Sequence, residues 1–104
     1  MEEKITALIE VKVSPNNTDG FNKIAEKIYS YEEISSVYLM SGSYDFLVSI
    51  ENYSLQEIAL FVHERLAPIE GVIGTSTSFV LHKYKENGKI HKKRKITGRI
   101  SVTP

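Results

Sequence analysis

Apolar residues recur at every second position in some stretches of the chain and at every third or fourth position in others. Ile5 to Val13 alternates apolar and polar residues, which is typical of a half-buried strand. Phe21 to Ile28 instead places its apolar residues on one stripe of a helix. The two patterns continue along the chain and predict, in order, strand, helix, strand, strand, helix and strand, over residues 5–13, 21–28, 34–41, 44–51, 55–66 and 72–85.

This order predicts an α+β domain with the ferredoxin-like βαββαβ fold. Both helices of that fold cover one face of an antiparallel sheet, so the other face is left open. By strand alternation, the apolar side chains of the open face are Leu8, Tyr38, Met40 and Leu47. A contiguous apolar patch on a small domain usually marks an interface. We therefore predict a homodimer in which two sheets pack face to face, as in a dimeric α/β barrel.

Turn and cap residues set the expected limits of the elements. Ser54 and Glu57 have the spacing of a capping box at the start of the second helix. Asn87-Gly88 favours a type I′ hairpin, because both residues tolerate positive φ, and Lys89 onward is expected to return as a fifth strand. We expect a domain over residues 1–86 and a basic β-extension over residues 87–104.

Charge is divided unevenly between these two parts, although the formal net charge is zero. Residues 1–84 hold six Lys/Arg against twelve Asp/Glu, whereas residues 85–104 hold seven Lys/Arg against Glu86 alone. The cluster of interest is Lys89, Lys92, Lys93, Arg94, Lys95 and Arg99. Such a cluster can neutralise phosphates of a nucleic acid, discourage aggregation at a sheet edge or contact the acidic body of a neighbouring subunit. The sequence leaves these alternatives open.

A short turn with an aspartate directly after it joins the second and third predicted strands. Gly42-Ser43 fits a two-residue type II′ turn, with Gly42 supplying the positive φ. Asp45 could accept hydrogen bonds from a ligand ammonium group. The hydroxyls at the start of the last strand, on Thr75, Ser76 and Thr77, could bind a carboxylate together with local backbone amides. The simpler alternative is that Asp45 caps its own turn and that the hydroxyls belong to ordinary strand residues.

Other kinds of site find little support in the sequence. The chain has no cysteine, which excludes disulfides and thiolate metal sites and favours a reducing cytoplasm. No apolar run approaches the roughly 20 residues of a membrane span, and neither a signal peptide nor a membrane partner is expected. We predict no metal, no cofactor and no enzymatic activity, because no ligand spacing, nucleophile elbow or phosphate-binding loop is present.

Three segments together resemble the ligand-binding domain of the Lrp/AsnC regulators, also called the RAM domain. They are Gly42-Ser43-Tyr44-Asp45-Phe46-Leu47-Val48, the helical Phe61-Val62-His63-Glu64-Arg65-Leu66, and Ile69-Glu70-Gly71-Val72-Ile73-Gly74-Thr75-Ser76-Thr77-Ser78-Phe79-Val80-Leu81 with Tyr84-Lys85. The resemblance covers roughly residues 5 to 85. It implies dimers formed through their sheets, rings of dimers that are often octamers, and an amino-acid effector bound between dimers.

Carried over by position, the resemblance implies that Gly42, Tyr44 and Asp45 form the hairpin side of the effector site. Thr75, Ser76 and Thr77 would lie near the polar ends of the effector. About four residues precede the first predicted strand, so the chain resembles a stand-alone sensor domain without the family's helix-turn-helix, or a cloned fragment. Direct DNA binding in the family's usual way is not expected, although the basic tail leaves a contact open.

We therefore expect a non-enzymatic, amino-acid-binding oligomer that modulates transcription or amino-acid metabolism through partner regulators, including full-length Lrp/AsnC proteins. One alternative is a nucleic-acid-associated protein that binds through the basic tail. The other is a small ferredoxin-like enzyme with Asp45 as an acid or base.

Overall fold

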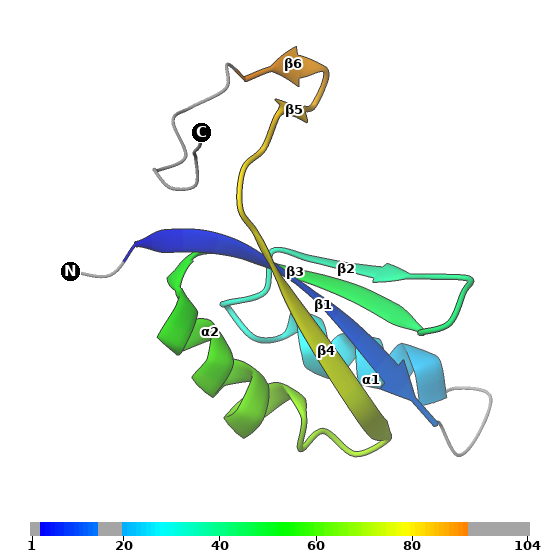
Figure 1. Ribbon diagram of the computed structural model, residues 1–104. Helices are drawn as coiled ribbons and strands as arrows, with labels where there is room; N and C mark the ends of the chain where they lie inside the picture. Colours follow the sequence, from blue (N-terminus) through cyan, green and yellow to red (C-terminus); the bar gives the residue numbers. More distant parts are fainter. Residues whose placement is uncertain (1–2, 15–19, 92–104) are drawn as a thin grey trace.

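A four-stranded antiparallel sheet forms the centre of the protein. The computed structural model describes residues 3–14 and 20–91. The strands are β1 (Lys4–Val13), β2 (Ser36–Leu39), β3 (Phe46–Ser54) and β4 (Val72–Val80), in the spatial order β2-β3-β1-β4 (Figure 1). The predicted ferredoxin-like order of elements is confirmed. The N-terminal strand β1 lies between two strands that come much later in the chain.

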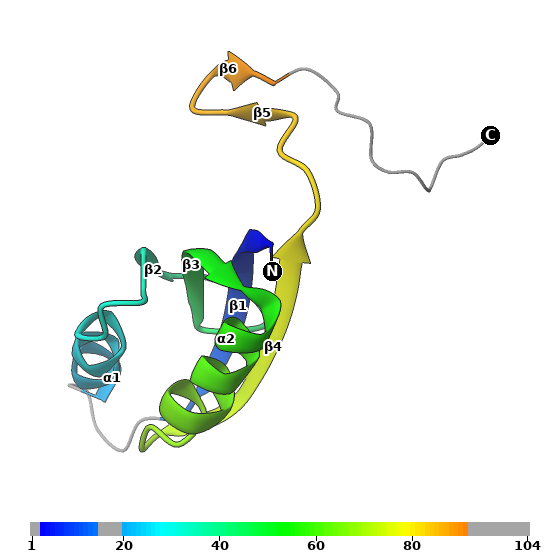
Figure 2. The ribbon, with the colours of Figure 1, turned by 90° about the vertical axis from the view of Figure 1, so that its left-hand side faces the viewer.

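Both helices pack on one face of this sheet, as Figures 1 and 2 show. They are α1 (Gly20–Tyr29) and α2 (Leu55–Phe61), and α2 continues without a break into the π-helical segment η1 (Val62–Leu66). In the described part of the chain, no helix is both long enough and apolar enough to cross a membrane. The π-helix was not predicted, since the apolar stripe indicated one regular helix to Leu66.

The core lies between the sheet and the helices because strand residues alternate between the two faces. In β1, Ala7, Ile9 and Val11 are completely buried, whereas Leu8 between them is 37% exposed on the other face. The core is completed by residues of β1, β3, both helices, η1 and the turn before β4, namely Val13, Ile24, Ile28, Phe46, Val48, Ile50, Ile58, Phe61, Leu66 and Ile69. The period-two pattern of the sequence therefore fixed which face of β1 is buried.

The capping box predicted at the start of the second helix is present. The backbone N–H of Glu57 donates to Ser54 Oγ at 3.1 Å, and the Ser54 N–H donates to Glu57 Oε1 at 2.8 Å. These bonds satisfy two amides that the first turn would otherwise leave without partners. The hydrogen bond from the Ser54 amide is the main cause that lowers the pKa of Glu57 below its ordinary value of 4.5.

The prediction of a two-residue turn at Gly42-Ser43 is wrong. The β2–β3 ladder ends at the pair Leu39–Phe46, so residues 40–45 form the connection. Gly42 is not among the described glycines with positive φ, which are Gly71 and Gly88. The longer loop arises because the Asp45 N–H donates to Val11 O at 3.0 Å, which ties the chain to β1 before it enters β3.

The last long strand is shorter than predicted, because β4 ends at Val80 rather than near residue 85. Its pairing with β1 stops at Thr6–Val80, and the ladder of β1 with β3 shifts register at this same place, between Ile5 and Thr6. The chain then leaves the sheet and forms a separate hairpin.

This hairpin stands away from the body of the molecule in both views (Figures 1 and 2). Its strands are β5 (Lys85–Glu86) and β6 (Lys89–Ile90), which pair with each other. The predicted turn at Asn87-Gly88 is confirmed, with φ of 54° and 79°. We call residues 81–91 the arm.

Candidate functional site

The loop between β2 and β3 is fastened to the end of β1 by Asp45. Asp45 Oδ2 accepts a hydrogen bond from the backbone N–H of Val13 at 2.8 Å. Lys12 Nζ adds a contact to Ser43 O at 3.2 Å, and the loop is closed by Met40 N–H donating to Asp45 O at 2.8 Å. The bond to Val13 joins Asp45 to another strand rather than to its own loop. Asp45 therefore holds the loop against β1, and its carboxylate is only partly buried.

Gly42 and Tyr44, two other residues of the predicted site, lie in this same loop. Gly42 is exposed, and a Cβ built on it would meet no atom within 4 Å. Tyr44 is partly buried beside Asp45. The structure thus gathers Gly42, Tyr44 and Asp45 in one loop with open space at its tip.

The hydroxyl residues at the start of β4 are divided between the two faces of the sheet. Thr75 pairs with Val11 and Thr77 with Ile9, both core-facing residues of β1, and the two threonines are partly buried. Ser76 between them is exposed on the open face. The three hydroxyls therefore do not point to one place within this chain, but β4 is an edge strand, which leaves backbone groups along its outer side available to a ligand.

The loop and the start of β4 lie at the same end of the sheet. Lys12 pairs with Gly74 on one side of β1, and Asp45 binds Val13 on the other. Only β1 separates the two groups, which corresponds to two strand spacings, or about 10 Å. Asp45 and the start of β4 therefore lie at one end of the sheet in the same chain, which spacing along the sequence did not indicate.

The open face of the sheet carries the predicted interface residues. Tyr38 pairs with Leu47, and Leu8 lies in the adjacent strand, so all three occupy the face opposite the helices. Tyr38 is 57% exposed, Leu8 and Met40 are each 37% exposed, and Leu47 is partly buried. Leu8, Tyr38 and Leu47 therefore lie on the face that strand alternation indicated, whereas Met40 lies in the loop after β2, and the role of all four in a dimer stays a prediction.

The arm forms one wall of a hollow over this open face. The hollow has a volume of about 560 Å³ and is lined by Leu8, Ser49 and Glu51 of the sheet and by His82 and Tyr84 of the arm, among others. Apolar side chains on the arm remain uncovered, with Leu81 89% and Ile90 75% exposed. Of the predicted basic cluster, Lys89 lies in β6, whereas Lys92, Lys93, Arg94, Lys95 and Arg99 lie outside the described residues.

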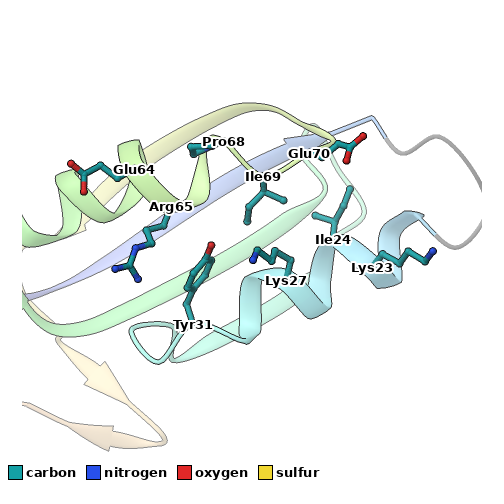
Figure 3. A pocket seen from close by; sticks show the side chains of 9 residues that line it. All are labelled: Lys23, Ile24, Lys27, Tyr31, Glu64, Arg65, Pro68, Ile69 and Glu70. Carbon is teal, nitrogen blue, oxygen red and sulfur yellow. The ribbon is translucent and has the colours of Figure 1, made fainter.

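A second hollow lies between the two helices, and sequence reasoning missed it (Figure 3). It contains Lys27, Tyr31, Arg65 and Ile69. The spacing of Lys23 and Lys27 along α1 is the only sequence signal that points toward it. Within residues 3–14 and 20–91, no three His, Asp or Glu side chains gather as metal ligands would.

The chain is similar to a family of ligand binding domains and to proteins named as transcriptional regulators. The model of a family described as the Lrp/AsnC ligand binding domain matches residues 6–90. The chain is 44% identical over 102 residues to YugG of Bacillus subtilis, an uncharacterized HTH-type transcriptional regulator, covering 98% of this chain and 61% of that protein. It is 35% identical over 86 residues to the HTH-type transcriptional regulator FL11 of Pyrococcus furiosus, covering 83% and 54%. The chain thus spans little more than half the length of these curated relatives.

A solved structure shows the same fold. A transcriptional regulator of Neisseria meningitidis, determined as a complex with L-Met, superposes with a TM-score of 0.72 at 23% identity. The superposition covers 84% of this chain and 56% of that one.

Proposed function

The chain belongs to the Lrp/AsnC ligand binding domain family, and we propose that it acts as a non-enzymatic sensor that binds an amino acid. The signal would pass on through assembly with other copies and with partner regulators, and so modulate transcription or amino-acid metabolism. The curated relatives are named transcriptional regulators, which supports a regulatory rather than a catalytic role. We place this activity in the cytoplasm.

The observation that carries this proposal is the position of Asp45 at the end of the sheet. Its partly buried carboxylate is held in place by the Val13 amide at 2.8 Å, so it need not be ordered by the ligand. A fixed carboxylate suits the ammonium group of an amino acid, since charge-assisted hydrogen bonds are the strong ones. Gly42 leaves space at the loop tip for the ligand.

The carboxylate of the same ligand would bind at the start of β4. Thr75, Ser76 and Thr77 supply hydroxyls on both faces of this edge strand, and the strand supplies backbone amides. Because the hydroxyls diverge, we propose that a neighbouring subunit completes the site and supplies the walls that select the side chain. The L-Met complex of the Neisseria regulator supports an amino acid as the ligand class.

We further propose a homodimer formed through the open face, and a ring of such dimers. Leu8, Tyr38, Met40 and Leu47 provide its apolar centre, and each contributes about 25 cal/mol for every Å² of its remaining apolar surface that is removed from water. The exposed Leu81 and Ile90 support a role for the arm in the same contact, because the arm would then pack on the partner. We propose that the basic cluster of Lys89, Lys92, Lys93, Arg94, Lys95 and Arg99 contacts an acidic surface of the partner, or nucleic acid.

A thermal-shift screen against the twenty amino acids tests the sensor proposal. A ligand at about a hundred times its Kd stabilises the native state by roughly 2.7 kcal/mol, which gives a clear rise in the unfolding midpoint. Oligomer size should be followed in the same samples by light scattering. If no amino acid shifts the midpoint at millimolar concentration, the sensor proposal is wrong.

A further inference from the structure

The hollow between the helices has the size and lining of a small-molecule site. Its volume is about 420 Å³, within the range of roughly 300–1,000 Å³ that such sites occupy. Ile24 of α1 and Ile69 of the turn before β4 are both buried and give it an apolar wall. Lys27, Tyr31 and Arg65 give it a polar end (Figure 3).

At the polar end, two cations lie close to one aromatic ring. Lys27 Nζ is 5.4 Å and Arg65 Cζ is 5.7 Å from the centroid of the Tyr31 ring. Phe61 braces this ring through an edge contact at 5.4 Å. Figure 3 shows Tyr31 between the two cations, with its hydroxyl directed into the hollow. Each cation is attracted to the ring, and an anion at the hydroxyl edge of Tyr31 would be attracted by both positive charges.

The nearby carboxylates neutralise this end only weakly. Arg65 Nη1 lies 3.9 Å from Glu33 Oε2, the long end of the ion-pair range, and both side chains are open to solvent that screens the pair. Lys27 has no carboxylate partner within 4.0 Å in the described part of the chain. Glu64 and Glu70 lie at the rim and point away from Tyr31 (Figure 3).

The backbone beneath Arg65 is also unusual. Arg65 lies in η1, where Ala67 N–H donates to Val62 O, five residues earlier, at 2.8 Å. This π-helical turn ends the helix, because residues 67 to 71 form turns and a bend before β4. Such a turn rotates the side chains that follow it, and here it forms the wall of the hollow that carries Arg65.

We infer that this hollow binds a small organic anion, that is, a carboxylate or phosphate group attached to an apolar body. Arg65, Lys27 and the Tyr31 hydroxyl bind the anionic group, and Ile24 and Ile69 contact the apolar body. The site shares no residue with the proposed amino-acid site at the β2–β3 loop and lies on the opposite face from the proposed dimer contact. It is therefore a second ligand site, and it does not depend on the first.

Titration followed by ¹H–¹⁵N NMR of the full chain tests this inference with three probes. Phenylacetate and phenyl phosphate carry the two candidate anionic groups, and phenylacetamide is their neutral counterpart. We expect both anions to shift the amides of Lys27, Tyr31 and Arg65 and the neutral amide to leave them in place. The tighter-binding anion identifies which group the site prefers. If neither anion shifts these amides at millimolar concentration, or if phenylacetamide shifts them equally, the inference is wrong.

Matched substitutions separate a built site from general attraction to positive charge. Arg65→Gln and Lys27→Gln should each raise the Kd of the better probe about tenfold, the usual effect of losing a charge-assisted hydrogen bond. Lys85→Gln, which removes one exposed charge from the arm, should leave the Kd unchanged. Equal weakening by Lys85→Gln would overturn the inference. Should Arg65→Gln unfold the protein through loss of its contact with Glu33, Lys27→Gln decides alone.

Discussion

At the scale of single residues, Asp45 combines a structural and a chemical role. Its carboxylate accepts from the Val13 amide, thirty-two positions away in the sequence. The sequence indicated that Asp45 is unusual, because a charge follows directly on a turn in an apolar strand. It could not indicate Val13 as the partner, since that contact exists only once β1 and β3 have paired.

Substitution of Asp45 separates these two roles. Asp45→Asn keeps an oxygen that accepts from Val13, so it should cost about half as much stability as Asp45→Ala, because a charge-assisted hydrogen bond is roughly twice as strong as a neutral one. The loss of charge should abolish most of the amino-acid-induced thermal shift. Asp45→Ala should also lower the free energy of unfolding by about 1–2 kcal/mol, because the partly buried Val13 amide loses its partner. Urea unfolding gives the stabilities. Full effector response in Asp45→Asn would remove Asp45 from the ligand site, and neither change should dissolve the dimer.

Gly71 makes a residue-scale prediction about stability. Its φ is +100°, and an added Cβ would lie 2.6 Å from Ile24 Cδ1. Gly71→Ala should lower the free energy of unfolding by roughly 1–3 kcal/mol, through backbone strain and displacement of Ile24. Gly74→Ala is the control, because no atom lies within 4 Å of its added Cβ. Similar urea midpoints for the two variants would contradict this explanation.

At the scale of elements, local spacing predicts a feature well where all the residues that stabilise it lie within a few positions of one another. The capping box of Ser54 and Glu57 and the turn at Asn87-Gly88 are complete within a few residues, and both were predicted. The end of β4 and the course of residues 40–45 depend on where β1 stops pairing, so local spacing misplaced them. The hollow beside the π turn at Val62–Leu66 likewise depends on how α1 and η1 lie relative to each other, which local spacing does not indicate.

The capping box predicts a pH dependence for α2. The pKa of Glu57 is lowered, so the folded protein binds this proton less tightly than the unfolded chain does. Its stabilising contribution is therefore present above the ordinary value of 4.5 and is lost as the pH falls through the lower, folded value. Glu57→Gln still accepts from Ser54 but does not titrate, so its urea midpoint should fall less steeply below pH 4.5 than that of the native protein.

Glu26→Gln, on the exposed surface of α1, is the control for removing one helix carboxylate. An acid profile of Glu57→Gln that coincides with the native profile would show that the cap does not contribute through its charge.

At the scale of the whole molecule, the uncovered sheet face predicts a dimer that one charge should disrupt. Leu8→Lys places an ammonium at the centre of the proposed contact and should raise the dimer Kd at least tenfold, and on the order of a hundredfold if a second Leu8 faces it. Leu60→Lys, on the exposed side of α2, should leave the Kd unchanged. Light scattering over a dilution series measures both. A native chain that is monomeric at micromolar concentration would refute the dimer.

The position of β1 in the middle of the sheet determines how late in folding the sheet can be fully paired. Lys4 pairs with Ser54 and Thr6 with Val80. Both edges of β1 are therefore paired only after β4, the last strand of the sheet, has been added. Contacts between such distant positions carry a large loop-closure cost and slow folding. During synthesis on the ribosome, β1 can pair with β3 once β3 has emerged, but its other edge stays unpaired until β4 emerges. The last strand therefore acts as the closing step of folding, and the protein is most exposed to aggregation just before that strand is in place.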